Sequence, residues 1–146
     1  LNDAWNGEEG LADFAGCLST IIERVQRETT SDLVLLTPNM MNTSADGVAN
    51  RDDRRACEAS AVLQNRGVVG LYAQVVRDLA IRFDVVCADV YAAWSAHAET
   101  GTDTNAWLAN HMNHPTAEAH AIPASLLMKL VAASEPREAT GNPTRA

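Results

Sequence analysis

The segment from His111 to His120 holds the residues of the chain that are best suited to proton-transfer chemistry. His114 stands directly before Pro115, and two further histidines lie within six residues of it. A proline fixes its own φ near −65° and keeps the preceding residue out of the helical region, which predicts a well-defined backbone at His114. An imidazole takes up and releases protons near neutral pH. His114 is therefore the leading candidate for a general base.

Helices are predicted before and after the segment from His111 to His120, and two of them have one apolar stripe. Apolar residues recur at helical spacing over 11–25 and again over 68–83. A short helix is predicted over 90–94, and the last helix over 117–133. Because Pro123 has no N–H to donate, we expect this last helix to be bent or to begin late.

Two short apolar runs, 33–36 and 85–88, predict parallel strands that are buried on both faces. Their alternation with the helices predicts an α/β fold, in which 66–83 is long enough to cross between paired parallel strands. In such sheets ligands bind at the carboxyl ends of the strands. Asn39, Asp89 and the loop around His114 all follow strand ends or lie just beyond them.

The polar stretch 39–65 is longer than most loops of a compact domain, so it either serves a function or contains a short helix near 56–63. Residues 134–146 are rich in Glu, Pro, Thr, Gly and Asn, a composition that predicts a disordered tail. The expected organisation is thus one domain over 1–133 followed by that tail.

Charge and hydropathy exclude several classes of partner. The net charge is −8 and the sequence pI is about 4.8, so binding to nucleic acid is not expected. The longest basic cluster, Arg54-Arg55, is offset by Asp52-Asp53. No apolar run reaches the roughly 18 residues that a membrane span needs. Apolar residues make up 47% and charged residues 21% of the chain, which is typical of a globular domain.

Several short motifs, in this order and spacing, resemble the SGNH/GDSL family of ester hydrolases. The similarity runs from residue 1 to about residue 133 and rests on four segments. Leu1-Asn2-Asp3 resembles the family's Gly-x-Asn-Asp block with its Gly just before the start, and 32–38 resembles the strand that follows this block. Residues 72–89 resemble the next helix and strand, and His114-Pro115 with His120 resembles the final block.

The resemblance implies a flavodoxin-like three-layer α/β/α fold with a parallel sheet, present here as an incomplete C-terminal part. It implies a serine hydrolase that cleaves carboxylic esters (acetylated carbohydrate, short acyl ester or lipid) through an acyl-enzyme, with no cofactor. His114 would be the base and Asn2 an oxyanion-hole donor. No serine in the chain stands in a nucleophile motif, so the family's Gly-Asp-Ser block and its second oxyanion donor, a Gly, are expected before Leu1.

The carboxylate that should orient His114 departs from the family pattern. The family usually has Asp three residues before its histidine, where this chain has His111. Asp89 and Asp103 are candidates for this acid, although Asp89 is better suited to capping a helix and Asp103 to a turn. A Ser-His dyad without a carboxylate is a further alternative.

Two other classes of function stay open. His111, His114 and His120, with Glu118 nearby, suggest a zinc-dependent hydrolase, although the His-Glu-x-x-His pattern is absent. The second alternative is a non-catalytic α/β binding domain that kept the scaffold and lost the acid. The missing Asp before His114 favours this alternative, whereas the presence of both Asn2 and His114 opposes it.

Overall fold

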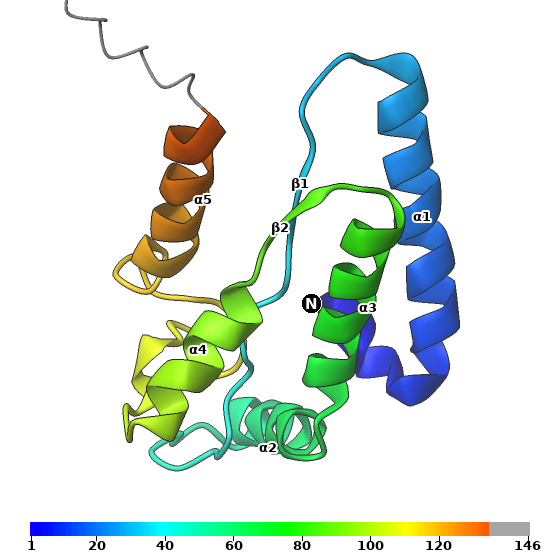
Figure 1. Ribbon diagram of the computed structural model, residues 1–146. Helices are drawn as coiled ribbons and strands as arrows, with labels where there is room; N and C mark the ends of the chain where they lie inside the picture. Colours follow the sequence, from blue (N-terminus) through cyan, green and yellow to red (C-terminus); the bar gives the residue numbers. More distant parts are fainter. Residues whose placement is uncertain (135–146) are drawn as a thin grey trace, which may run out of the picture.

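A computed structural model describes residues 1–134 (Figure 1). The tail predicted over 134–146 lies, apart from Ser134, outside the described residues. The elements along the chain are η1 Asn2–Asn6, η2 Glu8–Gly10, α1 Leu11–Glu28, β1 Val34–Leu36, α2 Arg51–Asn65, α3 Val68–Arg82, β2 Val86–Ala88, α4 Val90–Glu99, η3 Thr104–Trp107 and α5 Ala121–Ser134.

The two strands are parallel neighbours, as their apolar runs predicted. Val34 pairs with Val86 and Leu36 with Ala88, and α2 and α3 form the connection between the strands. Together with the surrounding helices this pair makes an α/β arrangement. The predicted crossover helix is confirmed as α3, and α5 begins late, with Pro123 in its first turn where no N–H is needed.

Helices α2 and α4 are longer than the sequence predicted. The expected short helix near 56–63 is the second half of α2, which begins at Arg51 after Asn50. The side chain of Asn50 accepts hydrogen bonds from the N–H groups of Asp52 and Asp53 and so caps the helix. Helix α4 extends five residues beyond the predicted end at Trp94, to Glu99.

The main core lies between the sheet and the helix pair α1 and α3, which run side by side on one face of the strands (Figure 1). Leu35 of β1 points into this core and packs with Ile22, Val76 and Leu79. Helix α5 lies on the other side of the sheet and contacts β2 and α4. Trp94 is buried in a second cluster between α4 and α5.

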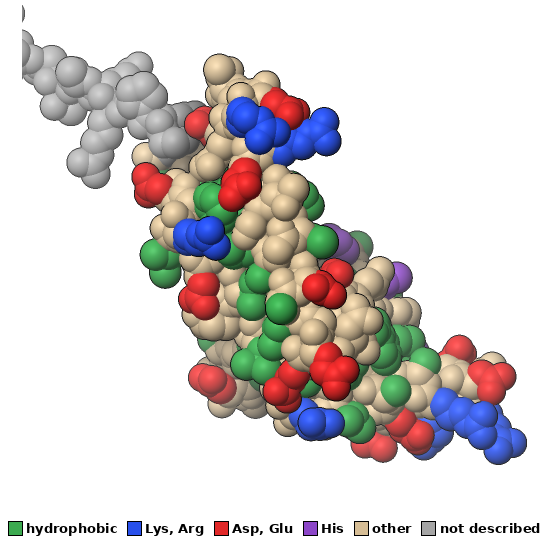
Figure 2. Space-filling view, turned by 90° about the vertical axis from the view of Figure 1, so that its right-hand side faces the viewer, with side chains coloured by type: hydrophobic (Ala, Val, Ile, Leu, Met, Phe, Trp, Pro, Cys, Tyr) green, Lys and Arg blue, Asp and Glu red, His purple; other side chains and the backbone are tan. Residues whose placement is uncertain are grey.

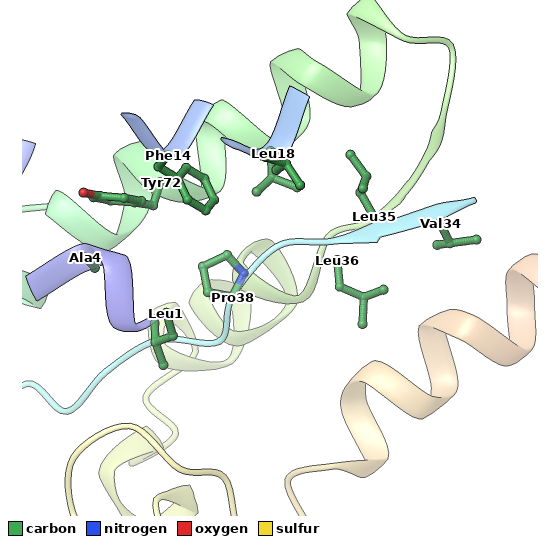
Figure 3. Close-up of a pocket in the computed structure, with 10 residues that line it drawn as sticks. Leu1, Ala4, Phe14, Leu18, Val34, Leu35, Leu36, Pro38 and Tyr72 are labelled. Atoms are coloured by element: carbon green, nitrogen blue, oxygen red, sulfur yellow. The ribbon is translucent and has the colours of Figure 1, made fainter. Parts of the chain in front are cut away.

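Strand β1 has an open edge. β2 occupies one side of it, and no strand within residues 1–134 occupies the other. An apolar cavity of about 320 Å³ lies along this edge (Figure 3). Its wall is formed by the three residues of β1, by Phe14 and Leu18 from α1, and by Pro38 and Leu1, which lie at the end of the cavity away from Val34. Leu36 and Val86, on the sheet face away from α1 and α3, are 41% and 51% exposed.

Candidate functional site

His114 lies in a short loop between η3 and α5. The ends of this loop are held by an antiparallel bridge between Leu108 and Pro115. The N–H of Ala109 donates to the carbonyl oxygen of His114 at 2.8 Å, and the N–H of His114 donates to the side chain of Asn110 at 2.9 Å. The imidazole itself is exposed and makes no hydrogen bond to any part of the chain that the structure describes. The backbone of His114 is therefore fixed while its ring remains accessible.

Asn2 is the first residue of η1, and it too is exposed. The turn that carries it is anchored to α3: Ala4 is buried against Val69 and Tyr72, and the Tyr72 hydroxyl donates to the carbonyl oxygen of Gly7 at 2.9 Å. Leu1 lines the apolar cavity beside β1. Asn2 is thus exposed on a turn whose neighbouring residues are held against α3 and the cavity beside β1.

Asn2 and His114 are both linked to the segment that follows β1. Leu1 and Pro38 line the same cavity, and Figure 3 shows them facing each other near its end. The side chain of the next residue, Asn39, donates to the carbonyl oxygen of Asn113 at 3.2 Å. Leu1, next to Asn2, thus shares a cavity with Pro38, and Asn113, next to His114, is bonded to Asn39. Pro38 and Asn39 follow the carboxyl end of β1, the end of a parallel strand at which α/β proteins bind ligands.

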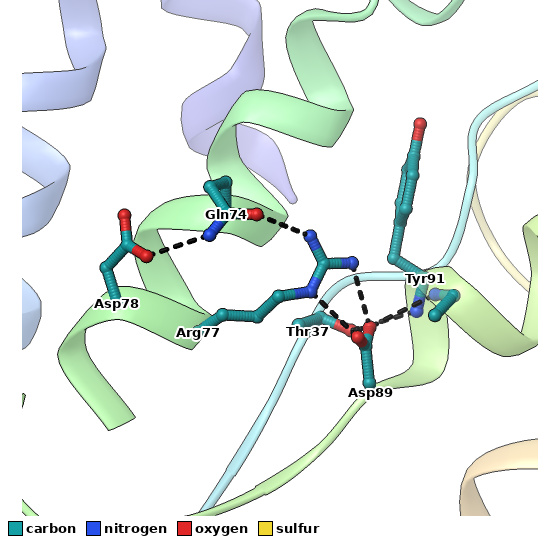
Figure 4. Close-up of polar contacts among 7 residues, drawn as sticks. Thr37, Gln74, Arg77, Asp78, Asp89 and Tyr91 are labelled. Carbon is teal, nitrogen blue, oxygen red and sulfur yellow. Dashed lines mark hydrogen bonds and ion pairs between the residues drawn. The ribbon is translucent and has the colours of Figure 1, made fainter. Parts of the chain in front are cut away.

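Asp89, one candidate for the acid, is occupied by other partners (Figure 4). Arg77 of α3 donates to both of its carboxylate oxygens, at 2.7 and 3.0 Å. The Thr37 hydroxyl and the N–H of Ala92 also donate to it, which makes Asp89 the N-cap of α4. Burial raises the pKa of Asp89, but the hydrogen bonds from Arg77, Ala92 and Thr37 outweigh burial and hold the pKa below its ordinary value.

Asp103, the other candidate, caps η3 by accepting a hydrogen bond from the N–H of Asn105 at 3.0 Å. Neither Asp89 nor Asp103 is bonded to the imidazole of His114 in the described part of the chain. Both carboxylates have the capping and turn roles that their local sequence favoured.

His111 and His120, the other two histidines of the possible zinc site, have no hydrogen-bond partner in common. His111 has a left-handed backbone with φ 57°, and its carbonyl oxygen accepts from the thiol of Cys57. Nδ1 of His120 lies 2.8 Å from the carbonyl oxygen of Thr116, on the approach to α5. Within residues 1–134, no group of three or more His, Cys, Asp or Glu side chains is arranged to hold a metal ion.

Two polar arrangements near the strand ends were not predicted from the sequence. One is the hydroxyl of Thr37, which accepts from the N–H of Tyr91 and donates to Asp89, so it joins the ends of β1 and β2. The other is Asn110, whose side chain bonds three backbone N–H groups of the His114 loop. An Asn side chain often bonds the backbone N–H group two residues further on and so forms a turn. This preference could have indicated the role of Asn110.

Acidic side chains are spread over the face shown in Figure 2, with apolar side chains between them and basic groups interspersed. No extended basic surface is visible on that face. Among the described residues, none of the helices has the length and apolar character needed to cross a lipid bilayer.

Comparisons with protein-family models, with curated proteins and with solved structures found no match to this chain.

Proposed function

We propose that this chain supplies the general base and one oxyanion donor of a serine hydrolase that cleaves carboxylic esters. The observation that carries the proposal is the placement of Asn2 and His114. Both residues are exposed; their chain neighbour Leu1 lines a cavity with Pro38, and their chain neighbour Asn113 is bonded to Asn39, just beyond the carboxyl end of β1. These neighbours support a common site for the two side chains, and an accessible imidazole and an accessible amide are the groups that acyl transfer requires beside its nucleophile.

The reaction would proceed in two steps. A serine hydroxyl, provided by protein outside these residues, attacks the ester carbonyl while His114 takes its proton and returns it to the leaving alcohol. The side-chain N–H₂ of Asn2 donates to the oxyanion that forms on the carbonyl oxygen. Water then attacks the acyl-enzyme while His114 takes its proton; the bond to the serine oxygen breaks, His114 returns the proton to that oxygen, and the carboxylic acid is released. No cofactor enters these steps.

The open edge of β1 supports a larger sheet of the flavodoxin-like kind. An unpaired strand edge exposes N–H and C=O groups that another strand can bond. The apolar cavity beside that edge, and the exposed Leu36 and Val86 on the outer sheet face, are surfaces that a further strand and helix would cover. We propose that such elements carry the serine and complete a three-layer α/β/α fold.

The second candidate function is a non-catalytic α/β binding domain. It is favoured by the carboxylates, since Asp89 is held by Arg77 and Asp103 caps η3, which leaves the His114 imidazole without an acid among the described residues. A domain of this kind would use the same sheet edge for binding without bond cleavage.

A fluorophosphonate probe separates these two functions, because it labels only a serine whose hydroxyl is activated. The full-length natural protein is incubated with the probe and digested, and the labelled peptide is identified by mass spectrometry. We expect one labelled serine outside residues 1–146, and hydrolysis of p-nitrophenyl acetate that the probe abolishes. Absence of both labelling and hydrolysis would favour the binding domain. Labelling of a serine within residues 1–146 would contradict the proposed site.

A further inference from the structure

The loop that carries His114 is closed at its base by backbone hydrogen bonds. The N–H of Thr116 donates to the carbonyl oxygen of Trp107 at 2.7 Å, and the N–H of Ala109 donates to that of His114 at 2.8 Å. Between these two bonds lies the Leu108–Pro115 bridge. The residues inside the closed loop must satisfy their N–H groups without a strand or helix partner.

Asn110 satisfies most of them with one side chain. Its Oδ1 accepts from the N–H groups of Met112 at 3.1 Å, Asn113 at 2.9 Å and His114 at 2.9 Å. Its Nδ2 donates to the Oδ1 of Asn113 at 2.9 Å. A single amide therefore sets the path of the chain from residue 111 to the histidine.

Other parts of the fold hold the loop from outside. The N–H of Asn42 donates to the carbonyl oxygen of Met112 at 2.8 Å, and Asn39 donates to that of Asn113. The buried thiol of Cys57 in α2 donates to the carbonyl oxygen of His111. Three N–H groups of the loop are bonded to Asn110, that of His111 is bonded to Leu108, and carbonyl groups of the loop are bonded to the scaffold. The loop therefore has little freedom to move the histidine.

We propose that Asn110 is a positioning residue that fixes His114 through the main chain of His114, in a site where none of the described residues places a carboxylate on the imidazole. The inference rests on the proposed function in so far as it concerns catalysis. An acid that contacts the ring fixes its direction directly, whereas Asn110 fixes the Cα of His114 and the direction in which its side chain leaves the backbone. A displacement of about 1 Å in a catalytic group can lower a rate on the order of 100-fold, so this control of the backbone is sufficient to matter.

The test compares Asn110→Ala and Asn110→Asp in the full-length natural protein. The Ala variant loses all four hydrogen bonds of the side chain. The Asp variant keeps an oxygen that can accept from the three N–H groups, so it should rescue the loop. Gln26→Ala is the control, because it removes another side-chain amide that bonds the backbone: Gln26 donates to the carbonyl oxygen of Phe83, and both residues are remote in sequence from the loop.

Two measurements are made on each variant. In Asn110→Ala we expect amide hydrogen exchange at Met112, Asn113 and His114 to rise at least roughly tenfold, and the His114 imidazole resonances to broaden or divide. We expect kcat for p-nitrophenyl acetate to fall on the order of 10- to 100-fold with KM nearly unchanged. Asn110→Asp should restore most of both, and Gln26→Ala should alter neither.

The inference is overturned if exchange at these three amides and the His114 resonances in Asn110→Ala match the control. It is also overturned if an active protein keeps its kcat in Asn110→Ala although the loop has loosened. If the parent protein hydrolyses no ester, the proposed function fails by itself, and the exchange data and imidazole resonances still decide whether Asn110 fixes His114. If the Ala variant does not fold, the Asp variant decides, since it must retain most of the amide protection and most of the parental kcat.

Discussion

Arg77 donates two hydrogen bonds to the carboxylate of Asp89, from Nε to Oδ2 at 2.7 Å and from Nη2 to Oδ1 at 3.0 Å. The pair joins the middle of α3 to the residue that caps α4, and Thr37 ties the end of β1 to the same carboxylate. Two side chains, from α3 and from the end of β1, thus bond one anion at the start of α4, and the side chain of that anion, Asp89, is 34% exposed.

Replacing Asp89 by Asn should lower the free energy of unfolding by about 1 kcal/mol, because an amide can still cap α4 but cannot form the charge-assisted pair with Arg77. Asp103→Asn is the matched control, since Asp103 caps η3 without an ion pair and Asn caps equally well. Urea denaturation at pH 7 measures both changes. Equal stability of the two variants would show that the Arg77 pair adds nothing to the cap.

The same pair predicts a dependence of stability on pH. The pKa of Asp89 is lower in the folded state than the value of about 3.9 typical of an unfolded chain, so the unfolded state binds more protons in this range. The stabilisation is therefore complete above about pH 4 and is lost as the pH falls through the lower folded pKa. Urea midpoints of the parent and of Asp89→Asn should converge on acidification below pH 4. A constant difference down to pH 2 would contradict this assignment.

His114→Ala in the full-length protein should lower kcat for p-nitrophenyl acetate on the order of 10³-fold or more, the scale expected when a general base is lost. His120→Ala is the control, since its ring bonds only the carbonyl oxygen of Thr116 among the described residues. Steady-state kinetics with matched melting curves separate catalysis from folding. Parental turnover in His114→Ala would remove this residue from the base role.

Asn2→Ala should lower kcat on the order of 100-fold, because one oxyanion donor contributes about 3 kcal/mol to the transition state and little to substrate binding. Asp3→Asn alters the neighbouring residue, which is also exposed, and should leave kcat unchanged. If KM rises in Asn2→Ala while kcat stays constant, the amide binds substrate without stabilising an oxyanion.

Residues 1–146 expressed alone should self-associate and show no esterase activity above background. The exposed Leu36 and Val86, with the open edge of β1, offer an apolar surface and unpaired backbone groups to other chains. The double variant Leu36→Lys/Val86→Lys should reduce association in analytical ultracentrifugation. Ile81→Lys, which changes an 81% exposed residue of α3, should have little effect. A monodisperse monomer of 15.7 kDa with a cooperative melt would contradict the prediction.

The sequence predicted those parts of the fold in which apolar residues alone mark the element. The strand runs and the α3 stripe have this property. The cap at Asp89 was predicted separately, from the preference of Asp for the N-cap position. Helix α2 was underestimated because its buried positions include Ser60 and Gln64, which break the apolar pattern although the spacing is helical. Gln64 is buried because its side chain accepts from the N–H of Met41 and donates to Tyr91, which only the folded chain reveals.

The catalytic roles of the candidate residues stay predictions, and the hydrogen bonds that hold these residues could be predicted only in small part. His114 and Asn2 were identified from short motifs, and the structure leaves both accessible. The bond from Asn39 to Asn113 could not be foreseen, because it joins residues 74 positions apart whose types are common in any turn. The roles of Asp89 and Asp103 were open in the sequence because a carboxylate at a strand end or in a loop suits both capping and catalysis.

The separation of 74 residues between Asn39 and Asn113 also bears on the order in which the chain folds. Contacts this distant in sequence carry a large loop-closure entropy and form late, after local helices such as α3 have a chance to appear. The His114 loop is held by such contacts, from Asn39, Asn42 and Cys57. In pulse-labelling during refolding, amide protection at Asn113 and His114 should therefore develop after that of α3. The His114 loop would then become ordered only after the ends of β1 and β2 have paired.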